Sequence, residues 1–190
     1  MKSFDAYVRK QLLEKFPSMV FFFVISMLPE FSAKAFGFFF LVIFSIASDV
    51  RQKRLDLLLY LPLTRKRIFL FEYAFLTLLL FVSFFAGLPF ASRTVETWVM
   101  LFKSLIFLWA YLGIVLSAVS VGMDPFGAAF LFLLFDLVVS SIGSSRLSAN
   151  FNPYKLISPI RQDNTVLSAA FALFIIYASY KLFTQKGGEK

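Results

Sequence analysis

Three ionisable side chains lie inside long apolar runs of this chain, at Glu72, Lys103 and Asp136. A charge within an apolar span is costly, so it indicates either a buried partner or a functional site. Glu72 falls about one turn inside its run, close to Arg65 and Lys66, and this favours a salt bridge at the membrane interface. Lys103 lies near the end of its run, where its long side chain can extend to the membrane surface.

Asp136 is the deepest of the three, about ten residues after Pro125 or roughly 15 Å along a helix. Its sequence neighbours are apolar and offer no hydrogen bond. We therefore expect Asp136 to face the bundle interior or a dimer interface, with a hydroxyl, an amide or Lys103 as its partner. A structural role in holding helices together is favoured over a place along a substrate path, and the sequence leaves both open.

The residue types needed for enzyme chemistry are mostly missing. The chain has no histidine and no cysteine, which removes the commonest general base, the commonest metal ligand and any thiolate nucleophile. It has no G-x-x-x-x-G-K-[ST] phosphate-binding sequence, and no acidic pair has the spacing of a metal site. We predict a protein that is not an enzyme, with no catalytic residue, no metal ligand and no cofactor of its own. A lipid-modifying membrane enzyme is disfavoured on the same grounds.

The composition indicates a membrane protein. The 190 residues are 59% hydrophobic, with a mean hydropathy of +0.80, which is more apolar surface than a soluble fold of this size can bury. One transmembrane domain covering residues 1–190 is expected. The net charge of +8 gathers at the ends of apolar runs, so lipid headgroups explain it better than nucleic acid does.

We predict an all-α fold with six transmembrane helices. The predicted elements are an amphipathic surface helix at 2–16, spans at about 17–33, 35–48, 68–90, 97–121, 126–142 and 164–183, and a cytoplasmic helix at about 50–61. The first two spans are predicted as a hairpin that turns near Lys34, because a single helix would place Glu30 in mid-membrane. All seven prolines fall at proposed boundaries. Small residues at Gly113, Ser117 and Ser120 predict close helix packing.

The basic residues predict the orientation. Thirteen Lys or Arg lie in 1–16, 49–67 and 181–190, and six lie in the remainder of the chain. Cytoplasmic segments carry the excess of basic residues, so we expect both termini in the cytoplasm. The expected location is the plasma membrane. Three of the other six lie in the predicted outer loop at 143–163, which reduces this bias.

The segment 49–67 is basic and contains a short helical pattern. Its basic residues are Arg51, Lys53, Arg54, Arg65, Lys66 and Arg67. Within it, Leu55, Leu58 and Leu59 fall on one helical face. Pro62 ends this helix, since proline disfavours helical geometry in the preceding residue, and Thr64 can cap the next helix.

This segment resembles the first cytoplasmic loop of the membrane subunits of ABC-2 type transporters. The resemblance is carried by a charged cluster (Asp49, Arg51, Lys53 and Arg54), a short leucine-rich helix, and then Leu61-Pro62-Leu63-Thr64-Arg65 before a new span. Thr64 stands where the family more often has serine. The resemblance covers the first half of the chain well and the second half in outline, where Asn152-Pro153 is similar to the Asn-Pro often found in the outer loop.

The resemblance implies the permease subunit of an exporter. In such transporters a separate ATPase subunit binds ATP and Mg and docks on the coupling helix, and two permease subunits pair as a homodimer or a similar heterodimer. The ATPase-docking residues implied here are Arg51, Lys53, Arg54, Leu55, Asp56, Leu58, Leu59, Pro62 and Arg65. Membrane lipids are the other expected partner. The alternative is a membrane anchoring or assembly protein that does not transport and uses the basic loop as a docking patch.

Overall fold

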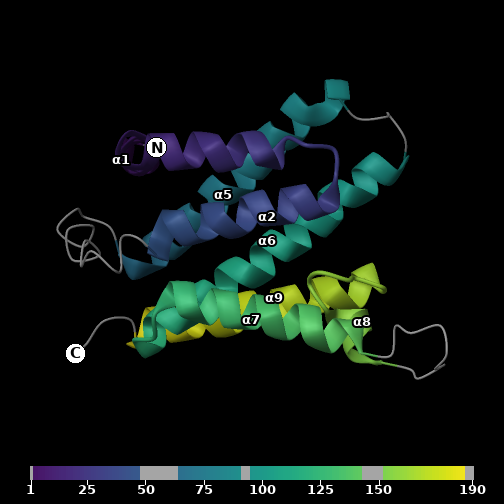
Figure 1. Ribbon diagram of the computed structural model, residues 1–190. Coiled ribbons are helices and arrows are strands. Elements are labelled where there is room, and N and C mark those ends of the chain that lie inside the picture. The colour runs from purple at the N-terminus through teal and green to yellow at the C-terminus, as the bar shows by residue number, and fades with distance from the viewer. Residues whose placement is uncertain (1, 48–63, 91–94, 143–151, 187–190) are drawn as a thin grey trace.

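The computed structural model describes residues 2–47, 64–90, 95–142 and 152–186, and these residues form helices joined by short turns (Figure 1). In chain order the elements are α1 (Lys2–Ser26), α2 (Phe31–Val42), the π-helical turn η1 (Ile43–Ala47), α5 (Arg65–Gly87), the 3-10 turn η2 (Leu88–Phe90), α6 (Val95–Val121), α7 (Pro125–Ser141), α8 (Tyr154–Ile157) and α9 (Thr165–Lys186). The predicted all-α class is confirmed for these residues. The predicted coupling helix at 50–61 lies outside them.

Three of the described helices are long and apolar enough to cross a membrane: Arg65–Phe90, Val95–Val121 and Thr165–Gln185. Two more apolar helices, Phe31–Ser45 and Pro125–Ser141, are shorter. A bilayer core of about 30 Å takes about 20 helical residues, so the shorter pair falls below that length. The structure therefore indicates a membrane protein with three candidate spans, and it does not support the prediction of six.

The N-terminal prediction differs from the structure. Residues 2–16 were predicted as a surface helix and 17–33 as a separate span, whereas a single helix, α1, covers Lys2–Ser26 and contains Pro17. A proline in a helix removes one backbone hydrogen bond, and this loss does not interrupt α1. Helix α1 is not among the candidate spans, because the first half of the helix carries several charged residues. Two of them, Asp5 and Arg9, form an ion pair of 3.2 Å.

The first turn of the chain comes earlier than predicted. The sequence places it near Lys34, but α1 ends at Ser26 and Lys34 lies in the first turn of α2, almost fully buried. The Lys34 ammonium donates a 2.8 Å hydrogen bond to the Ser26 carbonyl and lies 5.9 Å from the centre of the Phe84 ring. A cation is stabilised at the C-terminal end of a helix, where carbonyls are unpaired. Lys34 thus joins α2 to the end of α1 rather than marking a boundary.

Two predicted helix starts are confirmed by their capping contacts. The Thr64 side chain accepts a hydrogen bond from the Arg67 amide at the start of α5. Asp124 accepts a 2.7 Å hydrogen bond from the Gly127 amide at the start of α7, with Pro125 in the first turn. Each cap satisfies a backbone donor that the helix itself leaves unpaired.

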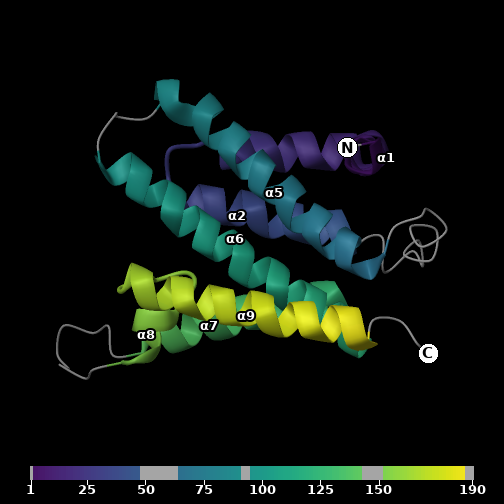
Figure 2. The same cartoon turned by 180° about the vertical axis from the view of Figure 1, so that it is seen from behind.

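Helix α6 is the centre of the bundle. It packs against α2, α5, α7 and most extensively α9, and its fully buried side chains include Leu108, Leu112 and Val115 (Figures 1 and 2). A Cβ added at Gly113 would lie 2.6 Å from Cγ2 of Ile175 on α9, so the two helices approach closely at that glycine. This agrees with the close packing predicted from the small residues of α6.

The helices run back and forth between two ends of the molecule. The start of α1, η1, the start of α5 and the end of α9 lie at one end, which we call the loop end (Figures 1 and 2). The turn between α1 and α2, η2 and α8 lie at the opposite end, which we call the α8 end. The segments that flank residues 48–63 therefore lie together at the loop end.

Candidate functional site

A buried polar cluster lies near the loop end, where α1, η1 and α5 meet. We call it the Glu72 cluster: Tyr7 and Gln11 of α1, Ser45 of η1 and Glu72 of α5. All four side chains are 1% exposed or less. The Glu72 carboxylate accepts hydrogen bonds from the Tyr7 and Ser45 hydroxyls, and Gln11 donates to the Tyr7 hydroxyl at 3.1 Å. The carboxylate is therefore bonded to two different elements.

The π-helical turn η1 contributes Ser45 to this cluster. Isolated π turns within α-helices occur frequently at functional sites. Ser45 donates through its hydroxyl to Glu72, and its carbonyl accepts a hydrogen bond from the Lys15 ammonium of α1. Ser45 precedes residues 48–63 and Glu72 follows them. The cluster thus connects the chain before the predicted ATPase-docking loop to the chain after it, and both to α1.

The predicted salt bridge between Glu72 and Arg65 or Lys66 is not formed. Within the described ranges, Arg65 and Lys66 make no ion pair with this carboxylate, and Lys66 is exposed. Glu72 is two helical turns into α5 and is fully buried, and its carboxylate accepts hydrogen bonds from Tyr7 and Ser45. The sequence located the acid correctly but not its partners, because Tyr7 is 65 residues away along the chain.

A second buried polar cluster lies toward the α8 end. We call it the Asp136 cluster: Tyr111 of α6, Asp136 of α7 and Ser158, which follows α8. Asp136 is completely buried, with Oδ1 accepting a 2.6 Å hydrogen bond from the Ser158 hydroxyl and Oδ2 a 3.3 Å bond from the Tyr111 hydroxyl. Asp136 faces the bundle interior, one of the two predicted environments. Of the three partners that the sequence left open, a hydroxyl, an amide or Lys103, the structure shows hydroxyls.

Side-chain to backbone bonds fix the segment around α8 onto the bundle. Asn152 donates a 2.7 Å hydrogen bond to the Val139 carbonyl at the end of α7. Gln162 donates a 2.9 Å bond to the Lys103 carbonyl of α6, and the Ser168 hydroxyl of α9 donates to the Leu156 carbonyl at 3.0 Å. Residues 152–164 are therefore held by α6, α7 and α9, and the Ser158–Asp136 bond is one of several attachments.

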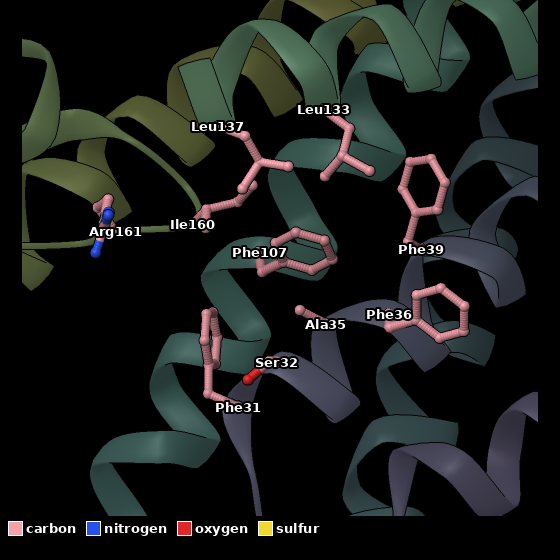
Figure 3. A pocket seen from close by; sticks show the side chains of 10 residues that line it. All are labelled: Phe31, Ser32, Ala35, Phe36, Phe39, Phe107, Leu133, Leu137, Ile160 and Arg161. Carbon is pink, nitrogen blue, oxygen red and sulfur yellow. The ribbon is translucent and has the colours of Figure 1, made fainter. Parts of the chain in front are cut away.

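An apolar groove of about 500 Å³ opens between α2, α6 and α7 (Figure 3). Its lining residues are Phe31, Ser32, Ala35, Phe36, Phe39, Phe107, Leu133, Leu137, Ile160 and Arg161. Arg161 lies at the end of the groove away from Phe36 and Phe39 (Figure 3). The groove was not predictable from sequence, because its walls come from four separate parts of the chain.

The predicted docking residues are mostly outside the described part of the chain. Arg51, Lys53, Arg54, Leu55, Asp56, Leu58, Leu59 and Pro62 all fall within residues 48–63. Arg65 is described and begins α5 at the loop end. Five polar residues of the two clusters were not predicted: Tyr7, Gln11, Ser45, Tyr111 and Ser158. The sequence pattern around these residues is weak. Tyr7 and Gln11 lie one helical turn apart on α1, and Ser45 and Ser158 belong to no recognisable motif.

Comparison of the sequence with protein-family models, with curated proteins and with solved structures gives no match.

Proposed function

We propose that this chain is the membrane-spanning permease subunit of an ABC-2 type exporter in the plasma membrane, driven by a separate ATPase. The proposal rests on the sequence of the 49–67 segment and on one structural observation. That observation is the Glu72 cluster, which connects both flanks of the segment to each other and to α1. Docking on this segment would therefore act on three helices together.

The physical mechanism is the conversion of a rigid-body movement into helix displacement. An ATPase pair that closes on ATP would pull the 50–61 helix, and the Ser45–Glu72 hydrogen bond would transmit this movement to η1 and α5 together. Tyr7 and Lys15 extend the connection to α1. In this proposal the ATPase binds ATP and Mg, and the permease contributes only the moving spans.

We further propose that six helices enter the membrane, with both termini cytoplasmic. The apolar second half of α1, α2 with η1, and α7 would join the three candidate spans. Phe31–Ser45 extends about 22 Å at 1.5 Å per residue, so the bilayer would thin locally around it. In one bundle the centre is filled by α6, which leaves no room there for a substrate path. A second permease subunit, identical or similar, would therefore complete that path.

The test is copurification of the full-length protein with an ATP-binding subunit from its native membrane. Replacing Leu58 and Leu59 by Asp should release the ATPase while the protein remains inserted and keeps its thermal stability. Replacing the exposed residues Leu173 and Phe174 of α9 by Ala is the matched control and should keep the ATPase bound. Absence of any ATP-binding subunit from the wild-type preparation would refute the proposal and favour an anchoring or assembly role.

A further inference from the structure

The groove between α2 and α7 has the dimensions of a site for an extended chain. It follows α2 from Ser32 to Phe39, seven residues or about 10 Å. Half the hydrocarbon thickness of a bilayer is about 15 Å, so the groove reaches well into one leaflet from the α8 end. Its side toward lipid is open, since Phe36 is 52% exposed and Leu137 is 45% exposed. An acyl chain can therefore enter sideways from the membrane.

The polarity of the groove changes sharply at one end. Of the ten lining residues that the structure describes, eight are apolar and one, Arg161, is charged. The Arg161 side chain is exposed, and no carboxylate in the described ranges lies within ion-pair distance of it. The Ser158 hydroxyl accepts a 3.1 Å bond from the Arg161 amide, which fixes the backbone at this position. The groove thus combines an apolar channel with one fixed cationic end.

The other charged residues near the Arg161 end of the groove lie outside its lining or occur as a pair of opposite charges. The Ser32 hydroxyl donates a 2.8 Å hydrogen bond to the exposed Glu30 carboxylate, which is not part of the groove lining. A smaller hollow of about 330 Å³ shares Phe31 with the groove and adds Glu96 and Lys103, whose charges cancel. Among the described residues that line the groove, Arg161 alone carries a charge, and the nearby Glu30 carboxylate is held by Ser32 outside the lining.

We propose that this groove binds one acyl chain of an anionic phospholipid, with the phosphate against Arg161. A guanidinium binds phosphate through two parallel hydrogen bonds, which gives it a geometric advantage over a lysine at such a site. The aromatic and aliphatic walls provide the apolar surface that an acyl chain requires. The inference does not depend on transport, because a bound lipid could be either resident or carried.

The first experiment is photo-crosslinking of the full-length protein in nanodiscs that contain phosphatidylglycerol with a diazirine in mid-chain. Crosslinked peptides should concentrate on residues 31–39 and 133–137, relative to the exposed apolar face of α9 at Leu173, Phe174 and Tyr177. An even distribution of crosslinks over both regions would overturn the proposal, because it would mean ordinary contact with bulk lipid.

The second experiment separates the headgroup contact from the chain contact. Bound lipid is counted by native mass spectrometry for phosphatidylglycerol, phosphatidylethanolamine and diacylglycerol. Wild-type protein should prefer phosphatidylglycerol, and Arg161→Gln should reduce that preference by about two- to fivefold, as expected for one exposed ion pair. Arg67→Gln, at an exposed position at the loop end, is the matched control and should leave the preference unchanged.

A filling variant tests the channel itself. Ala35→Leu adds volume inside the groove and should reduce crosslinking of the diazirine phosphatidylglycerol at 133–137, whereas Ala170→Leu on the exposed surface of α9 should not. Equal binding of the three lipids by the wild type, or a preference for phosphatidylethanolamine, would overturn the assignment of an anionic headgroup. Because the protein is studied without an ATPase, these outcomes leave the exporter proposal unaffected.

Discussion

The bond between Asp136 and Ser158 can be measured by a double-mutant cycle. Single variants Asp136→Asn and Ser158→Ala, and their combination, isolate the pair from other effects of each change. Hydrogen bonds between membrane helices average about 0.6 kcal/mol and reach about 1.7 kcal/mol. The Ser158–Asp136 distance of 2.6 Å is short and the acceptor is fully buried. We therefore expect a coupling near the upper limit, about 1–1.7 kcal/mol.

The variant Asp136→Leu gives the larger effect. It leaves the Ser158 and Tyr111 hydroxyls without the carboxylate, and each buried unsatisfied group costs about 1–3 kcal/mol. We expect a loss of about 2–4 kcal/mol in the free energy of unfolding. Asp136→Asn should lose less than about 1 kcal/mol, because its amide oxygen still accepts a hydrogen bond.

The assay is unfolding of the full-length protein in detergent micelles titrated with sodium dodecyl sulfate and followed by circular dichroism. Ser141→Ala is the control for Ser158→Ala, since the Ser141 hydroxyl is exposed and donates only to the Val138 carbonyl of its own helix. It should show no coupling to Asp136→Asn. A Ser158–Asp136 coupling below about 0.3 kcal/mol, or an unchanged unfolding free energy for Asp136→Leu, would refute the role assigned to this contact.

Three further changes probe helix contacts and the loop-end connection. Gly37→Ala would place a Cβ 2.8 Å from the Phe22 carbonyl oxygen, so α1 and α2 must separate. We expect about 1–3 kcal/mol of destabilisation in the same titration. An unfolding free energy equal to that of the wild type would contradict the close approach of the two helices. Gly113→Ala should cost less, because Ile175 Cγ2 can shift, and Ile175→Ala in the same chain should recover part of the loss. Under the exporter proposal, Glu72→Gln should leave the proposed ATPase bound but lower its ATP hydrolysis in the complex. Unchanged hydrolysis would argue against transmission through the Ser45–Glu72 bond.

The sequence predicted the long central helices well. The runs at 68–90, 97–121 and 164–183 fall within three residues of the observed candidate spans at each end. Their length and uniform apolar character are typical of membrane-spanning helices, and prolines or helix caps lie near several of their ends. Each of these signals is local, which is why a single sequence was enough.

The first 47 residues were predicted less well because their structure depends on distant contacts. Lys34 looks like a boundary residue by charge, yet it is buried against the end of α1 and the Phe84 ring. Pro17 looks like a helix start, yet α1 continues through it. For Lys34 the contacts with α1 and with Phe84 decide its position, and a single sequence does not reveal those neighbours.

The candidate site was predictable only in part, for the same reason. The depth of Asp136 in an apolar run indicated that it needed a partner, and the structure provides one. Which hydroxyl it binds could not be inferred, since the chain has many serines in apolar contexts. The groove beside Arg161 could not be inferred at all, because no sequence pattern connects α2 to the segment that follows α8.

The Asp136–Ser158 bond also constrains the order in which segments of the protein can pack during synthesis. Ser158 is 22 residues after Asp136, so at about 5–20 residues per second the ribosome delivers it roughly 1–4 s later. During that interval α7 emerges with a carboxylate whose shortest hydrogen bond cannot yet form, while the Tyr111 hydroxyl is already available on α6. The final packing of α7 is thus expected to depend first on α6 and to be complete only once the segment around α8 has left the ribosome.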